Sequence, residues 1–579
     1  MLRRLWKLFG FESRPALRRS LRRRAPSFRP GLEALEDRLT PSGLTFHWTG
    51  AAGDGKWIDP SNWQEHASPH DNPPFGHPTL VFDYGNVALR NGVYQTASTD
   101  DLGASIELAN LQIQGTAKAG EGSFHIGGNA LTFDGSLAGI TDTANHGGTD
   151  VVSAPLEKPG LVLPVTVSGL DSLKLSAWTA PAGSENGLTK EGLGTLILAS
   201  SVNNAARGKT TVVGGALRLE GPAGVRQVTD NLEIDATASV ADNASGQLKF
   251  TNVKFEPLSH LALAPGVSDT VAALNSLRSG GAVNLGAGST LTIDGVGTFA
   301  GKISGGGGLT IASGEQILSG TNTYTGPTAV NGGELTLASA KAVQSSSGIT
   351  VASGATLGLQ GGLPFSAVPL TLNAGALDSK SGANVWQGAI ALAADATVAM
   401  QPGAALTLAG AVSGSHNLTV QGGILNLTGH DAAAVTTLLN ATLVVNGVAG
   451  AVTVDSGGIL EGTGTTGAVG VNNGGILEPG SASAHTGVLT SGAVTFAPGS
   501  AYAVQLSASG IGQLRANGRV SLAGATLRIT RAAGYSPASG TTFTLMRTDS
   551  ADSITGTFAS VPPGYAVTYN ATSVILKVD

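Results

Sequence analysis

The chain has 579 residues, of which 84 are Gly and none is Cys, with 41% apolar residues, 12% charged residues and a net charge of -6. The apolar fraction and low net charge exclude compositional disorder, and the irregular spacing of Gly excludes collagen. The lack of Cys excludes a disulfide framework and a thiolate metal site. Abundant small apolar residues suit a narrow core in which each coil of the chain stacks on the next.

Residues 1–40 are basic, with eleven Lys and Arg against four Asp and Glu, whereas the other 539 residues carry 22 against 35. Such a segment indicates either a targeting leader or an arm for nucleic acid or lipid. The motif at 32–42, LEALEDRLTPS, follows an arginine-rich approach and resembles the leader of large exported proteins in planctomycete-type bacteria. This resemblance implies export machinery as a partner and no nucleic acid. We expect residues 1–42 to form a disordered export leader.

Residues 43–180 are predicted to form an N-terminal β module. Trp48, Trp57 and Trp63 lie within 16 residues of one another, in a segment similar to a tryptophan-bearing module that begins many bacterial surface repeat proteins. Because the end coils of a solenoid need a cover, a packed cap is the favoured interpretation. The alternative is an exposed surface on which Trp48, Trp57 and Trp63 stack against a glycan.

A short strand pattern recurs through the rest of the chain: Gly, two residues, an aliphatic residue, one residue, and a second aliphatic residue. Period-2 alternation places both aliphatic side chains on one face of a strand. Its copies often lie about 20 residues apart without a helical pattern between them, which is typical of a solenoid. We therefore predict an all-β protein with a β-solenoid over residues 181–480. The pattern is led by Gly214, Gly288, Gly332, Gly354, Gly403, Gly422 and Gly524.

Two longer stretches, 187–219 and 309–339, resemble the autotransporter-associated β-strand repeat, also called the passenger-associated transport repeat. The second contains the Asn322-Thr323-Tyr324-Thr325-Gly326 centre, and 418–445 resembles a degenerate third copy that lacks Tyr-Thr-Gly. The resemblance implies a right-handed parallel β-helix on an exported protein. Residues 481–579 resemble the closing segment of such proteins, so we expect a C-terminal β-strand cap. No apolar run is long enough for a transmembrane helix, so we expect no transmembrane segment.

Candidate metal ligands lie mainly in one proline-rich stretch. Glu65, His66, His70, Asp71 and His77 could converge on a zinc ion, because imidazole and carboxylate groups are zinc ligands. Their spacing lacks a ligand-like helical period. A solvated loop is the favoured interpretation, and we predict no metal site.

Catalytic patterns are equally sparse. Residues 50–56 fit the spacing of a phosphate-binding loop, but Trp57 follows where a magnesium-binding Ser or Thr belongs. Polysaccharide lyases and glycosidases built on β-helices need clustered carboxylates, and stacked coils could bring Asp455 next to Glu478. Isolated charges that discourage edge-to-edge aggregation are the favoured interpretation. We predict no catalytic residue and no cofactor.

Together these features predict a non-enzymatic, exported protein of the cell surface or extracellular space, with a structural or adhesin-like role. Repetition along stacked coils would let weak contacts to polysaccharide or other cell-envelope components add up. Two alternatives stay open. One is a polysaccharide-active β-helix enzyme, either a lyase or a glycosidase, and the other is a scaffold that assists secretion of a surface assembly.

Overall fold

The computed structural model describes residues 44–69, 77–178, 185–204, 208–276, 280–481, 483–549 and 554–579. The predicted leader at 1–42 and two of the metal candidates, His70 and Asp71, lie outside these residues. In the described part, strands dominate, and the single helical element is the short 3-10 turn η1 (Pro60–Asn62). No helix found there is long and apolar enough to span a membrane.

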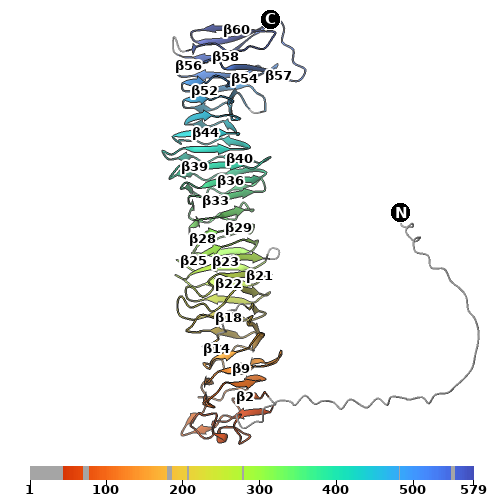
Figure 1. Ribbon diagram of the computed structural model, residues 1–579, viewed down its shortest axis with the longest axis vertical. Helices are drawn as coiled ribbons and strands as arrows, with labels where there is room; N and C mark the ends of the chain where they lie inside the picture. Colours follow the sequence, from red (N-terminus) through yellow and green to blue (C-terminus); the bar gives the residue numbers. More distant parts are fainter. Residues whose placement is uncertain are drawn as a thin grey trace, which may run out of the picture. The chain divides into compact units, whose positions relative to one another are not determined.

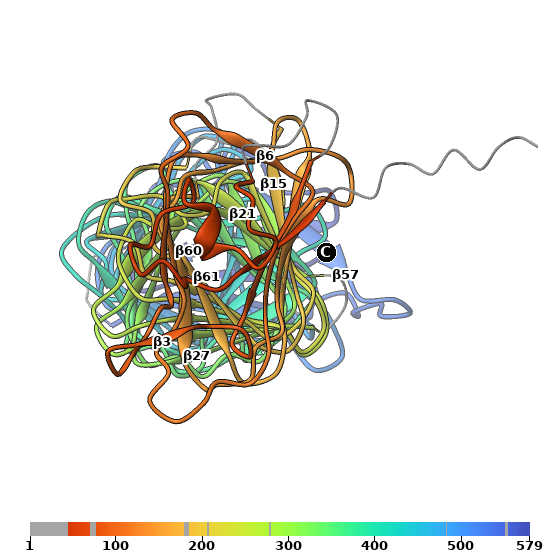
Figure 2. The same cartoon turned by 90° about the horizontal axis from the view of Figure 1, so that it is seen from below.

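The strands form sheets that run along the stacking direction of the coils (Figure 1). A 17-stranded sheet extends from β1 (Thr45–Trp48) to β41 (Val412–Ser413), and a 10-stranded sheet from β5 (Ala97–Asp100) to β27 (Lys302–Gly305). Later coils use a 13-stranded sheet, from β26 (Gly297–Phe299) to β59 (Ile554–Thr555), and a 9-stranded sheet, from β34 (Pro364–Phe365) to β57 (Thr526–Arg531). Each coil thus adds one strand to several faces, and Figure 2 shows the coils superposed around one interior.

Paired strands are parallel almost throughout, which confirms the predicted parallel β-solenoid. Among the strands of the described residues, only three pairs are antiparallel: β3 (Leu89–Arg90) with β4 (Val93–Tyr94), β58 with β61, and β60 with β61. The last two pairings involve β58 (Thr542–Thr548), β60 (Tyr565–Asn570) and β61 (Ser573–Val578), which close a 7-stranded sheet. They close the C-terminal end of the ladder, inside the range 481–579 where a strand cap is expected.

The parallel ladder is longer than the predicted range of 181–480. It begins with β1 paired to β2 (Thr79–Asp83), which pairs with β7 (Asn110–Gln114), and it continues into β54 (Ala501–Leu506) and β57. Residues 43–579 form one compact unit. The interior of the first coils mixes aromatic side chains, such as Phe82 and Phe124, with leucine and β-branched residues, so a pattern of paired aliphatic residues did not reveal these coils.

The Gly-led strands bury the aliphatic residues that the pattern selects. Leu335 of β31 (Glu334–Leu337) is in register with Leu357 of β33 (Thr356–Gln360), which is in register with Leu377 of β36 (Ala376–Ser381). All three are fully buried, and burial of each side chain contributes about 1.5–3 kcal/mol. Gly333 precedes β31 at φ +62, and a Cβ there would lie 2.1 Å from the carbonyl oxygen of Gly314. Only Gly fits this corner between stacked coils.

The centre of the second repeat links three coils. The buried Asn322 accepts a hydrogen bond from the Ile303 amide at 2.8 Å and donates one to the Ala342 carbonyl at 2.7 Å. The buried Tyr324 hydroxyl shares a hydrogen bond of 2.6 Å with Thr328 Oγ1, which contacts Ser346 Oγ at 2.9 Å. These contacts satisfy buried polar groups where the strands are interrupted, which gives the Asn-Thr-Tyr-Thr-Gly motif a structural role.

Candidate functional site

The three tryptophans of the first coils form a packed aromatic cluster. Trp48, Trp57 and Trp63 are each fully buried, and Trp63 makes edge-to-face contacts at 5.1 Å to Trp48 and 5.8 Å to Trp57. The Trp63 indole nitrogen donates to the Trp57 carbonyl oxygen at 3.0 Å. This burial corrects the glycan-stacking alternative, because no ring face of Trp48, Trp57 or Trp63 is open to a sugar. The geometry favours the interpretation as a packed cap.

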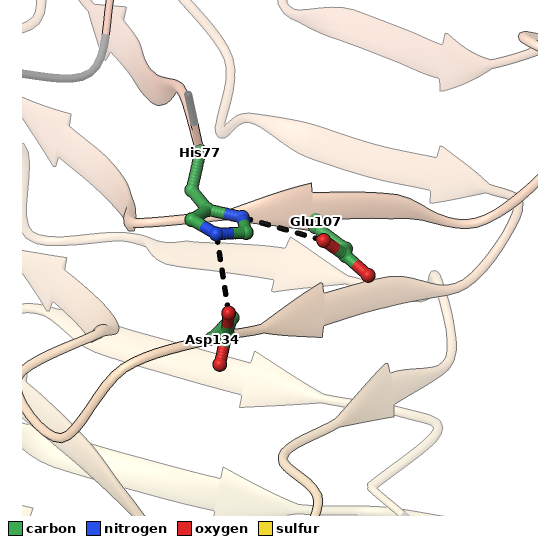
Figure 3. Close-up of side chains that lie close together, drawn as sticks. All are labelled: His77, Glu107 and Asp134. Carbon is green, nitrogen blue, oxygen red and sulfur yellow. Dashed lines mark ion pairs between the residues drawn. The ribbon is translucent and has the colours of Figure 1, made fainter. Parts of the chain in front are cut away.

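A histidine and two carboxylates meet on the surface of these first coils (Figure 3). His77 precedes β2, Glu107 lies in β6 (Ile106–Leu108), and Asp134 follows β9 (Leu131–Phe133). His77 Nδ1 lies 3.4 Å from a Glu107 carboxylate oxygen, and Nε2 lies 3.1 Å from one of Asp134. One potential ligand atom from each residue lies within 4.8 Å of the others.

This cluster has the residue types of a metal site but the geometry of a surface ion pair. Each ring nitrogen of His77 faces a different carboxylate, as Figure 3 shows, so the imidazole bridges the two acids. A single ion would need one nitrogen and both carboxylates on the same side. The side chains are 41–64% exposed, so water screens their attraction. The arrangement is therefore a surface contact between His77, β6 and the end of β9 that contributes little to stability.

Sequence reasoning singled out His77 but did not connect it with Glu107 or Asp134. Glu65 instead contacts His47: one carboxylate oxygen lies 2.7 Å from His47 Nδ1, and the other accepts a hydrogen bond of 2.9 Å from the His47 amide. Glu107 and Asp134 were missed because they come from different coils. The parallel register of β6 with β9 pairs Leu108 with Phe133. This register brings Glu107 and Asp134 close together, and it is the signal that could have identified them.

The proposed carboxylate pair Asp455–Glu478 is not formed. Asp455 follows β47 (Ala451–Val454) and accepts a hydrogen bond from Asn472 Nδ2 at 2.6 Å. Glu478 of β51 (Ile476–Pro479) is instead in register with Glu461 of β48 (Ile459–Gly462), on another sheet. The coil here advances 17 residues, from 461 to 478, and that spacing selects Glu461 as the neighbour.

Glu461, Glu478 and His485 form a second mixed acid and imidazole cluster. His485 Nδ1 lies 3.1 Å from a Glu478 carboxylate oxygen. Burial, followed by the nearby negative charge of Glu478, raises the pKa of Glu461. A carboxyl group whose pKa is raised can hold a proton and donate it to a bound molecule. A comparable pair, Glu315 and Glu334, is instead neutralised by Lys380, whose Nζ lies 2.8 Å from each acid.

A line of hydroxyl side chains follows the 13-stranded sheet. Thr397 of β39 (Ala396–Met400), Thr419 of β42 (Leu418–Gln421) and Thr437 of β44 (Val435–Leu439) are in successive register. All are partly exposed, and strands of neighbouring coils lie about 4.8 Å apart. We call this line the hydroxyl row. Its members are Thr397, Thr419, Thr437 and Thr453 and, beyond a gap at Gly470, Thr495, Ser521 and Thr555.

Comparison with known proteins identifies the repeats. Residues 188–219 and 304–337 match the family described as passenger-associated-transport-repeat. The chain is 29% identical over 256 residues to the adhesin BmaC autotransporter of Brucella suis biovar 1 (strain 1330). That match covers 43% of this chain and 6% of the relative, so the chain spans only a small part of BmaC. The crystal structure of the Haemophilus influenzae Hap adhesin aligns at 12% identity with a TM-score of 0.32, covering 90% of this chain and 65% of that one.

Proposed function

We propose that this chain, which carries two passenger-associated transport repeats, is an exported, non-catalytic β-helix protein that acts as an adhesin at the cell surface. The relative BmaC is named an adhesin and an autotransporter, which supports this function and this location. The proposed partners are hydroxyl-rich polymers of a cell envelope. Export machinery would recognise the basic segment at 1–42.

The hydroxyl row carries the proposal. Four successive threonines, Thr397 to Thr453, repeat at the spacing of the coils on one outward face. Hydroxyl groups both donate and accept hydrogen bonds, so each coil offers the same weak contact to a polysaccharide. Repeated weak contacts made by one rigid body give avidity without a deep pocket.

A polysaccharide-active enzyme is the second candidate, and the cluster of Glu461, Glu478 and His485 favours it. Most glycosidases use two neighbouring carboxyl groups as catalytic residues, and burial raises the pKa of Glu461. Against this, Glu478 is already engaged by His485. A scaffold for secretion of a surface assembly is a third candidate, which the repeats alone do not distinguish from an adhesin.

The test uses the purified full chain and isolated envelope polysaccharide. We expect co-sedimentation of the protein with the polymer and no release of oligosaccharides on long incubation. The double variant Thr419→Glu, Thr437→Glu should reduce retention, because two carboxylates interrupt the hydroxyl row. Thr371→Glu, on the 17-stranded sheet, is the matched control and should leave retention unchanged.

Two outcomes would overturn the proposal. Failure of the wild-type chain to bind any envelope polymer would remove the adhesin function. Release of oligosaccharides that is abolished in Glu461→Gln and Glu478→Gln would assign the chain to the enzyme class instead.

A further inference from the structure

Charge is segregated along the chain. Residues 41–480 carry 16 Lys and Arg against 32 Asp and Glu, whereas residues 481–579 carry six against three. The last coils therefore form a locally basic end on an acidic body. An acidic polymer would be repelled along most of the chain and attracted here, since the summed charge of a surface steers charged partners.

A groove lies on the outer face of these last coils. It is lined by β52 (Gly487–Ser491), β55 (Gly512–Ala516), β58 and β61. Its polar lining includes Thr490, Gln513, Arg515, Arg547 and Ser573. The pairing of β58 with β61 shifts register between Thr544 and Met546, and such an irregularity bends a strand locally. We call this hollow the arginine groove.

Two arginines stand side by side in the arginine groove. Arg515 is in register with Arg547, Thr490 flanks Arg515, and Ser573 flanks Arg547 on the next strand. Both arginine side chains are exposed. Like charges directly opposite each other on neighbouring strands destabilise a sheet, so folding alone does not favour this placement.

The two guanidinium groups are only partly neutralised. Arg515 Nη2 lies 3.2 and 3.3 Å from the two carboxylate oxygens of Asp549. In the described part of the chain, Arg547 makes no ion pair. A positive charge is thus left in the groove beside hydroxyl and amide side chains. Guanidinium groups bind carboxylate and phosphate oxygens through paired N–H donors.

We propose that the arginine groove binds an acidic polysaccharide, with Arg547 and Arg515 holding an anionic group of one sugar while Thr490, Gln513 and Ser573 bind its hydroxyls. This inference rests on the proposed adhesin function and names the polymer class that it would select. The anion could be a uronate carboxylate or a phosphate ester, because both have the oxygen geometry that arginine recognises.

The test measures binding of polygalacturonate to the full chain by isothermal titration calorimetry. We expect saturable binding that weakens as salt is added and no comparable binding of dextran, which is neutral. Arg547→Gln should weaken binding by about tenfold, the loss expected when a charge-assisted hydrogen-bonding group is removed. Arg515→Gln combined with Arg547→Gln should abolish it. Both residues are exposed, so unchanged circular dichroism would verify that the variants fold.

Arg528→Gln is the matched control, because Arg528 is exposed at the same end but lies on β57 of another sheet. An equal loss in Arg528→Gln would show that general charge, and not the groove, attracts the polymer, and would overturn the proposal. Inorganic phosphate is then added as a competitor. Competition would identify a phosphate ester as the preferred anion, and lack of competition would identify the carboxylate. In both cases Arg547→Gln must still weaken binding.

Two further results would refute the arginine groove without touching the adhesin function. One is retention of envelope polysaccharide that depends on Thr419 and Thr437 but not on Arg515 and Arg547. The other is self-association in sedimentation velocity that Arg547→Gln abolishes while wild type binds no polygalacturonate. That outcome would assign the groove to the acidic body of a second copy.

Discussion

The early coils and the later coils share one parallel architecture but bury different kinds of polar group. Between about residues 140 and 270 the interior contains carboxylates, lysines and a histidine, whereas most polar side chains buried after residue 290 are neutral. Asp378 and Asp431 are exceptions in the later part. The early ionisable set comprises Asp142, His146, Asp150, Lys158, Asp171, Lys190, Asp242 and Asp269, and the later set without ionisable groups includes Gln316, Asn322, Thr328, Ser379 and Asn384.

Several of the early ionisable groups are held by specific contacts. Asp150 accepts hydrogen bonds from the Tyr84 hydroxyl at 2.6 Å and the Phe124 amide at 2.7 Å. His146 lies between Asp150 and Asp171, with Nδ1 3.1 Å from Asp171 Oδ1. Burial, reinforced by the neighbouring Asp150, raises the pKa of Asp142 to about 8. The early interior is therefore sensitive to protonation.

The two transport repeats show the same contrast at equivalent positions. Lys190 of the first repeat is fully buried and donates from Nζ to the carbonyl oxygens of Glu191 and Gly192 at 2.8 Å and of Gly214 at 3.0 Å. Burial lowers its pKa to about 8. In the second repeat the matching strand position holds Ile311, also fully buried. A coil therefore accepts a charged or an apolar side chain at this position, provided that every buried polar group has partners.

Trp63→Ala should have the largest effect and should be confined to the first coils. It removes a fully buried ring that contacts Phe46, Trp48, Trp57 and Phe82, and such a change typically costs about 3–5 kcal/mol. Limited proteolysis with mass spectrometry should show cleavage within the early coils while the later coils stay protected. Ile58→Ala is the control, since Ile58 is 55% exposed, and it should cost less than about 0.5 kcal/mol.

Asn322→Ala should weaken the later coils by an intermediate amount. The change leaves the Ile303 amide and the Ala342 carbonyl without their side-chain partner, and each buried group left unsatisfied costs about 1–3 kcal/mol. Urea unfolding should show a lower midpoint. Thr321→Ala, at an exposed neighbouring position, should leave the midpoint unchanged, and an equal shift in both variants would contradict the bridging role of Asn322.

Asp242→Asn should have a smaller effect that depends on pH. Burial and the neighbouring Asp269 raise the pKa of Asp242 to about 9. Because the folded-state pKa lies above the unfolded value, the protonated acid stabilises the fold fully below about pH 4, and this contribution is lost as the pH rises towards 9. The amide cannot lose that proton. At about pH 8 the free energy of unfolding of the variant, measured in urea, should exceed that of wild type by at least about 1 kcal/mol. If this difference shrinks as the pH rises, Asp242 does not hold a proton in the folded state.

The sequence was sufficient to predict the coil but not the pairing between coils. The Gly-led pattern selected Leu335 and Leu357, which are buried in register, because alternation is a local property of a strand. The partner of Glu478 depends on the length of each coil, and the 17-residue advance to Glu478 selects Glu461 over Asp455. The arginine groove was missed for the same reason, since Arg515 and Arg547 are 32 residues apart around a longer final coil. The tryptophan cluster permitted two interpretations, which only burial could separate.

If the early coils of this β-helix bury ionisable groups and the later coils mostly do not, a rise in pH should lower the local stability of the early coils and leave that of the later coils unchanged. Hydrogen exchange with mass spectrometry at about pH 6 and about pH 9 brackets the pKa of Asp142, which is about 8, and exchange rates corrected for intrinsic pH dependence report local stability. We expect protection of β10 (Gly139–Asp142), β20 (Ser239–Asp242) and their neighbours to fall at the higher pH, while β31, β33 and β36 keep theirs. An equal loss in both regions, or a loss confined to the later coils, would contradict the division.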